Sequence, residues 1–474
     1  MQEVAHDFNL LWYLGIYGVL MVSIGIFYSR KIETSEDFIL AGKGLGAVVL
    51  MGTLMATWMG SGTVTGGQNS MAYSFGIWPA MLYSIASPIG ILILYLISAK
   101  IRNYGKYTIS GILEDKYGKE ARVLSSLIIV LAYVGIVSYQ LTGLGFVLNV
   151  TTGISVTVGT IIALFLTVFL ATIGGLKSVA PTDALSSFVI LIGLILGIPA
   201  VINTAGGWSE IINTVPESNL TITGGLTPLQ LSGYLLPGLF LLLGDQNMYQ
   251  RLSSSKGERE SKIGSLGWLI GILVMGPGVA IIAFSARAIF PSIDPGMAFI
   301  ATTTAVPRFI GGILLASATG SIITTGNSYL LSAATSFTYD FYDEFINPDA
   351  SDKKKLMITK ITIPILGLIS YVLIRYFPTI LDVQMYAYTV YAAGITPAVL
   401  AVFLWDRVNR AGGLSSMISG VIITLVWEIL LKKPYDINSV VVAVPVAVII
   451  LIVVTLITTK PKAQETTKTE AKEA

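Results

Sequence analysis

Hydrophobic runs long enough to cross a membrane follow one another along almost the whole chain. A transmembrane helix needs about 20 predominantly apolar residues, and about 13 stretches of roughly that length alternate with short polar connections. They cover residues 10–29, 44–70, 76–99, 122–149, 153–173, 180–203, 228–250, 263–286, 303–338, 357–375, 383–405, 412–431 and 437–458. The pattern predicts an all-α polytopic membrane protein with about 13 transmembrane helices.

Composition agrees with this pattern and excludes several kinds of chemistry. The 474 residues are 54% hydrophobic and 12% charged, which is about half the charged share of a soluble domain. The absence of Cys excludes disulfides, thiol catalysis and cysteine metal sites. The only His is His6, in the N-terminal tail, and no paired catalytic carboxylates stand out, so we do not expect an enzyme. The first ten residues contain no Lys or Arg, which argues against a cleaved signal peptide.

The basic residues predict the orientation of the chain. Alternate connections, beginning with the one after the first run, hold 24 of the 29 Lys and Arg residues, with Arg251 among them. The positive-inside rule places these connections in the cytoplasm, so we expect the N-terminus outside and the C-terminus inside a cell membrane. This topology explains the basic connections without any nucleic-acid ligand. The tail at 460–474 is charged, contains few apolar residues and is expected to be disordered.

Two of the predicted spans contain helix-breaking residues near mid-membrane. The second span carries Gly60-Ser61-Gly62, and the seventh, five spans later, carries Pro237-Gly238 and then Gly244. Paired interruptions of this kind are typical of transporters built from inverted repeats, with the binding site at the midplane. Unwinding of the second span would free backbone carbonyls that need a partner, and a cation is one such partner. The alternative is a small-residue packing surface, because Gly62 and Gly66 have the spacing of such a motif.

A column of hydroxyl groups crosses the ninth predicted span. Ser321, Thr324, Thr325 and Ser328 lie at offsets of 0, 3, 4 and 7, so one face of a helix collects them. An unpaired polar group at bilayer depth costs several kcal/mol, and hydroxyl oxygens are suitable ligands for a small hard cation. The same hydroxyls could instead bond to carbonyls one turn earlier or hold neighbouring helices together.

Acidic residues within the predicted spans offer further candidates. Asp183 follows Pro181 at the expected start of the sixth span, where it could complement the helix dipole or stand at the mouth of a cation path. Asp245 lies beside the interruption of the seventh span, and a buried acid there needs a partner or a purpose. Glu428, in the twelfth span, could contact a neighbouring helix.

Four segments give the chain a resemblance to a known family. They are 56–66, the Gly-Gly…Thr-Asp segment at 174–183, Gln250-Arg251 and the Trp-Asp-Arg segment at 405–413. Together they resemble the sodium/solute symporter family, which includes proline, pantothenate, galactose and sialic acid transporters, over residues 10 to 460. The resemblance implies a LeuT-like core of two inverted five-helix repeats, at 44–205 and 206–405. It would be preceded by an outside N-terminus, a first helix and a cytoplasmic loop (1–43) and followed by two C-terminal helices (406–459).

The resemblance also implies positions for ions and solute. The main sodium site would use the carbonyls of Ala56, Met59 and Ser321 with the hydroxyls of Thr324 and Thr325. Oxygens of low net charge suit Na⁺ better than a divalent ion. The positions matching a second sodium site are Asp183, Thr324, Asn327 and Ser328. The positions matching the family's solute pocket are Thr63, Gln140 and Asp245. Trp58 stands where the proline carriers have an important acid.

These observations predict a secondary active transporter that imports a small organic solute by Na⁺ symport through alternating access. The solute could be an amino acid, a sugar, a vitamin or a carboxylate, and we expect a monomer in the lipid bilayer. One alternative keeps the fold but couples to H⁺ through Asp183 or Asp245. A second is a membrane sensor, although the tail after Thr459 is too short for a kinase.

Overall fold

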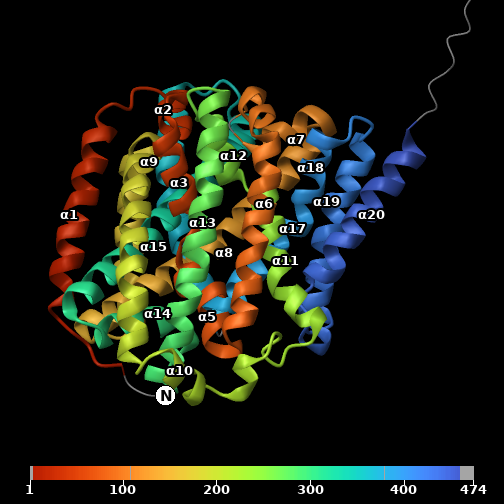
Figure 1. The fold of residues 1–474 in the computed structure, drawn as a ribbon. Coiled ribbons are helices and arrows are strands. Elements are labelled where there is room, and N and C mark those ends of the chain that lie inside the picture. Colours follow the sequence, from red (N-terminus) through yellow and green to blue (C-terminus); the bar gives the residue numbers. More distant parts are fainter. Residues whose placement is uncertain (1–3, 107, 378, 460–474) are drawn as a thin grey trace, which may run out of the picture.

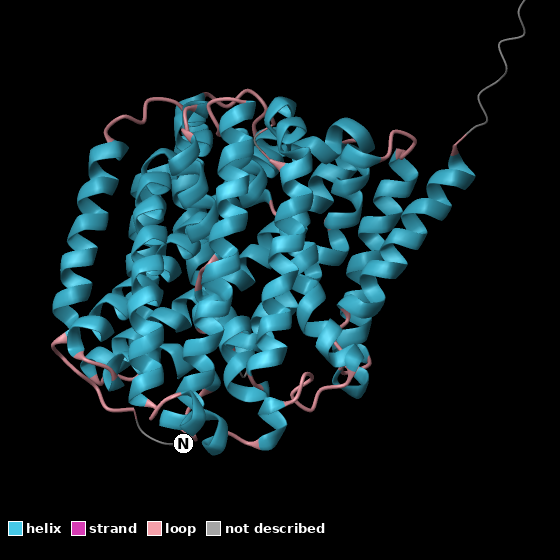
Figure 2. Cartoon of the chain, in the orientation of Figure 1, coloured by secondary structure: helices cyan, strands magenta, loops and turns pink. Residues whose placement is uncertain are grey.

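The computed structural model describes residues 4–106, 108–377 and 379–459, and these residues are helical almost throughout (Figures 1 and 2). The described part of the chain contains no strand, which confirms the predicted all-α class. The predicted disorder of 460–474 lies outside the described residues. Nine helices are long and apolar enough to cross a membrane by themselves within the described ranges. They are α1 (Leu10–Ser29), α6 (Ile77–Tyr104), α8 (Lys119–Thr152), α9 (Val156–Thr204), α13 (Glu258–Ile289), α15 (Arg308–Ser336), α16 (Asp352–Leu373), α19 (Arg410–Leu425) and α20 (Val440–Thr458).

Other crossings of the bundle are made by broken helices. The second span consists of α3 (Ala47–Trp58), α4 (Ser61–Val64) and α5 (Gly67–Phe75), with a bend of 51°. A bend of 40° separates α17 (Ile380–Gly394) from α18 (Thr396–Leu404). A third broken crossing joins α11 (Pro228–Gly244) to α12 (Gln246–Ser253) through Asp245. The interruptions predicted for the second and seventh spans are therefore present in the structure.

Gly175 divides α9 into two crossings. A helix of 49 residues would measure about 74 Å, more than twice the thickness of a bilayer core. Gly175 has a φ of +49°, and a Cβ atom there would lie 2.5 Å from the Phe38 ring, so only glycine fits this turn. Nine single helices, two bent pairs, the α11–α12 pair and the division of α9 together give the thirteen crossings that the hydropathy pattern predicts.

Short helices close the two ends of the bundle. At the end where α1 finishes lie α2 (Ser35–Leu40) and α7 (Ile109–Tyr117), and at the end where α1 begins lie α10 (Trp208–Thr214) and α14 (Ala298–Ala305) (Figure 1). Short 3₁₀ or π segments complete the described helices: η1 (Ala41–Lys43), η2 (Glu217–Leu220), η3 (Pro295–Met297), η4 (Phe337–Ile346), η5 (Ile374–Tyr376), η6 (Val426–Leu430) and η7 (Pro434–Asp436).

The two ends of the bundle differ in their basic residues. α1 begins at one end and α20 finishes at the other, as an odd number of crossings requires (Figure 1). At the end near α2 and α7, Lys177 pairs with Asp37 and Arg410 pairs with Glu120. Basic residues from two of the predicted cytoplasmic connections therefore lie at the same end of the bundle.

The sides of the bundle are apolar, and its centre is unusually polar. Large apolar side chains such as Trp12 in α1, Leu96 in α6 and Phe165 in α9 are exposed around the outside, as expected for a surface that faces lipid. The helix α15 runs through the interior, and every side chain from 314 to 336 is buried. Its hydroxyl column therefore faces other helices and not lipid.

Candidate functional site

The first break in the second span brings its backbone against α15. Met59 and Gly60 leave the helical conformation, and α4 then forms a single turn. The hydroxyl of Thr325 donates to the carbonyl oxygens of Ala56 at 3.0 Å and Thr57 at 3.2 Å. A Cβ atom on Gly60 would lie 2.4 Å from the Thr325 Oγ1, so the absence of a side chain at Gly60 allows this close approach. A carbonyl freed by the break and a hydroxyl of the column thus meet in the interior.

The other hydroxyls of the column are used differently. Thr324 Oγ1 donates to the carbonyl of Ser321 at 3.1 Å, and Ser321 Oγ donates to Ser317 at 3.0 Å. These bonds back to an earlier turn are the alternative considered from the sequence, and they hold for these two residues. Even so, four of the five positions expected to bind sodium form two pairs, Ala56 with Thr325 and Ser321 with Thr324. The fifth, Met59, adjoins Gly60, which packs on Thr325.

The oxygens gathered here are all uncharged. Among the described residues, no group of three or more His, Cys, Asp and Glu side chains could hold a metal ion. A divalent ion is normally held by several carboxylates, whereas carbonyl and hydroxyl oxygens without net charge suit a monovalent cation. The chemistry of the site therefore fits Na⁺.

Asp183 forms a buried ion pair that the sequence did not reveal. Its Oδ2 accepts hydrogen bonds from Thr53 Oγ1 at 2.6 Å and from Arg251 Nη2 at 3.3 Å. Arg251 is only 1% exposed, so its assignment to a cytoplasmic connection was wrong. Every residue of α12, which follows the break at Asp245, is buried, and the guanidinium of Arg251 in this helix reaches Asp183. The sequence signal for this ion pair was the position of a basic residue, Arg251, directly after an interrupted span.

The residues predicted for a second sodium site differ in their hydrogen-bond partners in this structure. Ser328 contacts Arg251 through a 2.5 Å hydrogen bond from Nη2, so Asp183 and Ser328 share the guanidinium. Asp183 Oδ1 and Asn327 Oδ1 are buried and have no hydrogen-bond partner among the described residues. Thr324 bonds within its own helix.

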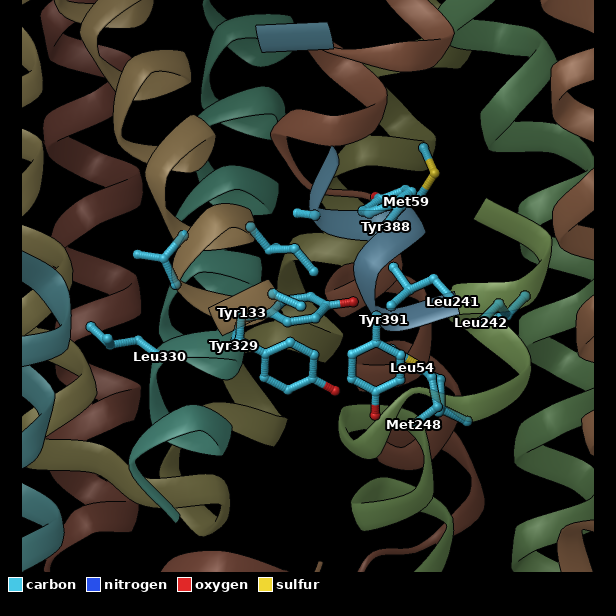
Figure 3. Close-up of a cluster of buried hydrophobic side chains, with 14 of the residues drawn as sticks. Leu54, Met59, Tyr133, Leu241, Leu242, Met248, Tyr329, Leu330, Tyr388 and Tyr391 are labelled. Carbon is cyan, nitrogen blue, oxygen red and sulfur yellow. The ribbon is translucent and has the colours of Figure 1, made fainter. Parts of the chain in front are cut away.

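Asp245 lies at the second break and is held by tyrosines. Its carboxylate accepts hydrogen bonds from Tyr133 at 2.6 Å, from Tyr329 at 2.5 Å and from the backbone N–H of Asn247 at 2.8 Å. Figure 3 shows Tyr133 and Tyr329 beside Tyr391, whose hydroxyl donates to the Gly244 carbonyl at 2.7 Å. The tyrosine hydroxyls thus donate hydrogen bonds both to the Asp245 carboxylate and to a backbone carbonyl at the break.

A small cavity lies beside the first break. Trp58 Nε1 donates to Ser87 Oγ at 2.9 Å, and the Trp58 ring is stacked with Tyr388 at a centroid distance of 6.4 Å. Gln384 accepts from the Gly67 N–H at 2.7 Å and donates to the Gly62 carbonyl at 3.2 Å. The lining residues are Trp58, Met59, Gly62, Thr63, Gln68, Tyr83, Ser84, Ala86, Ser87, Leu235, Gly238, Ile272, Gly276, Gln384 and Tyr388, and none of them is charged.

Only one of the three expected solute residues lines this cavity. Thr63 does so, whereas Gln140 accepts a hydrogen bond from the Ser61 N–H at 2.7 Å and caps the start of α4. Asp245 is bonded to the tyrosines and is not among the lining residues. The sequence reasoning missed Gln384 and Tyr388, which reach the cavity from α17, because neither lies beside a break or within a polar column.

A larger hollow opens near the start of α9. Asp294, Arg375 and Thr379 are among the residues that line it. It belongs to the end of the bundle where α1 begins, opposite the basic connections (Figure 1).

The fold and the paired breaks define a class of protein. An all-helical bundle with a ten-helix core of two inverted five-helix repeats, interrupted at corresponding helices, is a secondary transporter of the LeuT-like fold. The model of the sodium:solute symporter family matches residues 38–420. The chain belongs to the sodium:solute symporter family: it is a Na⁺-coupled solute symporter in a membrane and not an enzyme.

Individual relatives extend over nearly the whole chain. The osmoregulated proline transporter OpuE of Bacillus subtilis (strain 168) is 27% identical, over 94% of this chain and 94% of its own length. A sodium/proline symporter of Staphylococcus aureus (strain JH9) is 25% identical, over 98% of this chain and 95% of its own length. Among solved structures, a substrate-bound, outward-open Na⁺-coupled sialic acid symporter aligns with a TM-score of 0.80 at 19% identity, covering 95% of this chain and 98% of its own. These findings confirm the family predicted from the sequence.

Proposed function

We propose that the chain imports a small solute of no net charge, with proline as the first candidate, using Na⁺ bound between α3 and α15. The observation that carries the ion site is the 3.0 Å contact between the Thr325 hydroxyl and the freed Ala56 carbonyl. The proposed ligands are the carbonyls of Ala56, Met59 and Ser321 and the hydroxyls of Thr324 and Thr325. A Na⁺ ion would replace the hydrogen bond and hold α3 and α15 together.

The energy of transport comes from the ion's preference for one conformation. Moving one charge across the membrane supplies about 2.3 kcal/mol per 100 mV, in addition to the concentration gradient of the ion. The ion can use this energy only by binding the outward-open state more tightly than the inward-open state. A site built from two helices of opposite repeats meets that requirement, because relative movement of the repeats separates its ligands.

The lining of the cavity supports a compact solute without net charge. No Asp, Glu, Lys or Arg faces it, so a solute with a full net charge would lack a counter-ion there. Three aromatic rings, of Trp58, Tyr83 and Tyr388, line the cavity, and such rings attract an ammonium group through its positive charge. A zwitterion such as proline fits both observations, and two relatives carry proline in their names.

The remaining features of the proposal follow the basic residues and the unpaired oxygens. We place the basic end of the bundle and the C-terminus in the cytoplasm, the N-terminus outside, and the protein in the cell membrane as a monomer. A second Na⁺, if bound, would use Asp183 Oδ1 and Asn327 Oδ1, the two oxygens of that predicted site without partners, together with Thr324 and Ser328.

Transport by proteoliposomes tests the ion site. The double substitution Thr324→Ala and Thr325→Ala removes two of five ligands and should raise the half-saturating Na⁺ concentration at least tenfold. Thr335→Ala is a matched control, because its hydroxyl lies in the same helix but bonds back to Leu331. Unchanged Na⁺ dependence in the double variant would refute the site.

A thermal-stability screen tests the solute. Amino acids, sugars, vitamins and carboxylates are added to purified protein in Na⁺ and in choline buffer, because a ligand stabilises in proportion to the logarithm of its concentration over its dissociation constant. Proline should raise the melting temperature in Na⁺ only. Stabilisation by a sugar or an organic anion, but not by proline, would contradict the proposed solute while leaving the ion site intact.

A further inference from the structure

The guanidinium of Arg251 touches both helices that carry the proposed sodium ligands. Its Nε donates to Thr53 Oγ1 in α3 at 2.9 Å, and its Nη2 donates to Ser328 Oγ in α15 at 2.5 Å. Nη1 donates to the backbone carbonyl and to the side-chain oxygen of Asn247, both at 3.3 Å, within α12. One buried side chain from the seventh span thus joins the second span to the ninth.

The two anchor points lie one helical turn from the sodium ligands. Thr53 precedes Ala56 by three residues, and Ser328 follows Thr325 by three and Thr324 by four. Residues with this spacing lie on the same face of a helix, about 5–6 Å apart. The distance between Thr53 and Ser328, which the guanidinium spans, therefore controls the distance between the carbonyls of α3 and the hydroxyls of α15.

We propose that Arg251 is a positioning residue for the coupling ion: its guanidinium holds α3 and α15 at the separation that Na⁺ requires. It does so without supplying a ligand. This inference rests on the proposed sodium site between the two helices and adds an element outside that site. It also gives α12 a role, because this buried helix carries Arg251.

Asp183 neutralises the buried positive charge of Arg251. Its Oδ2 faces Arg251 Nη2 at 3.3 Å and also accepts from Thr53, so the positive charge beside the ion site has a counter-charge. Without that carboxylate, a buried guanidinium would repel Na⁺ and would be costly to desolvate. Asp183 in α9 and Arg251 in α12 therefore form a pair without net charge. This pair is a brace that connects the two helices to α3 and α15.

The shape of the guanidinium matters as much as its charge. Arginine presents several N–H donors in a rigid plane, so its Nε and Nη2 can bond to two different helices at once. Lysine keeps the charge but concentrates it on one flexible ammonium group, which cannot reproduce the same fork. Arg251→Lys therefore retains the partner for Asp183 and loosens the distance between α3 and α15.

Sodium binding by the purified full-length protein tests the inference without any solute. Radioactive Na⁺ binding gives the half-saturating concentration, and melting in choline buffer gives the stability of the ion-free protein. Arg251→Lys should raise the half-saturating Na⁺ concentration about tenfold, the low end for loss of a residue that orients ligands. Thr53→Val, which removes the anchor in α3 and none of the proposed ligands, should shift it in the same direction. Ser328→Ala should do the same, but it also removes a proposed ligand of the second ion. Combining either with Arg251→Lys should add little, because all three act through one brace.

Arg122→Lys is the matched control. Arg122 also forms ion pairs, partly buried, with Glu114, Asp340 and Glu344, but none of these partners lies in α3 or among the proposed ligands. It should leave the half-saturating Na⁺ concentration unchanged even if it lowers the melting temperature.

The outcomes separate the two proposals. If Arg251→Lys, Thr53→Val and Ser328→Ala bind Na⁺ at the wild-type concentration, with only their melting temperatures lowered, Arg251 has a structural role and the inference is wrong. If Arg251→Lys does not fold, Thr53→Val decides the matter in the same assay, because Thr53 is not a proposed sodium ligand. A wild-type protein that binds no Na⁺ would instead overturn the sodium site itself.

Discussion

The substitution Gly60→Ala measures how closely the broken second span must approach α15. A Cβ atom at Gly60 would lie 2.4 Å from Thr325 Oγ1, 2.5 Å from its Cβ and 2.6 Å from its Cγ2. Ordinary contacts of a Cβ begin at 3.4 Å, so the overlap is about 1 Å at all three atoms. The φ of Gly60 is −78°, outside the left-handed region that favours glycine, so we attribute the effect of alanine to this steric overlap.

Neither partner can move aside easily. Thr325 is buried in the middle of α15, and its hydroxyl already bonds to the second span. Overpacking of this kind typically costs about 1–3 kcal/mol. If Na⁺ binding must close the gap again, the same energy is lost from binding. The half-saturating Na⁺ concentration should then rise about 5- to 150-fold.

Radioactive Na⁺ binding to purified protein provides the assay. Gly18→Ala in α1 is a suitable control, because a Cβ atom there meets nothing within 4 Å. The reasoning is refuted if Gly60→Ala binds Na⁺ like the control, whatever happens to its melting temperature, because the close approach would then be unimportant for the ion.

Two further predictions concern the buried acids. Asp183→Asn leaves the Arg251 guanidinium buried without a counter-charge, so it should destabilise the protein by about 3–5 kcal/mol in a thermal-melt assay, and Asp183→Asn with Arg251→Gln should recover part of the loss. A melting temperature equal to that of the wild type would show that the pair is not formed. Asp245→Asn weakens the hydrogen bonds from Tyr133 and Tyr329, so it should lower the melting temperature while leaving solute preference unchanged. A changed solute profile in the uptake screen would place Asp245 in the pocket after all.

The number of spans and the breaks in the second and seventh spans could be predicted from local sequence, whereas the bend between α17 and α18 was not predicted. Hydropathy depends only on neighbouring residues, and a lipid-facing helix must satisfy its backbone within itself, so apolar runs identify crossings without knowledge of packing. Glycines such as Gly60 and Gly175 likewise indicate a break, because glycine allows backbone conformations and close contacts that a Cβ atom would prevent. The hydroxyl column on 321–328 was visible for the same reason: helical spacing alone aligns it.

The partners of the polar residues were decided only by the tertiary structure. Asp245 and Gln140, expected to face solute, instead satisfy tyrosines and the start of α4, and Arg251, expected in a cytoplasmic connection, is a buried partner of Asp183. These pairs join residues that lie 68 to 112 positions apart. A buried polar group can bind either a ligand or another side chain, because either partner removes the cost of leaving it unpaired. Which of the two it binds depends on the residues that pack against it. The sequence by itself determined which residues lie in the membrane and that the core is polar, and only the packing of the helices determined which of those polar groups remain free to bind.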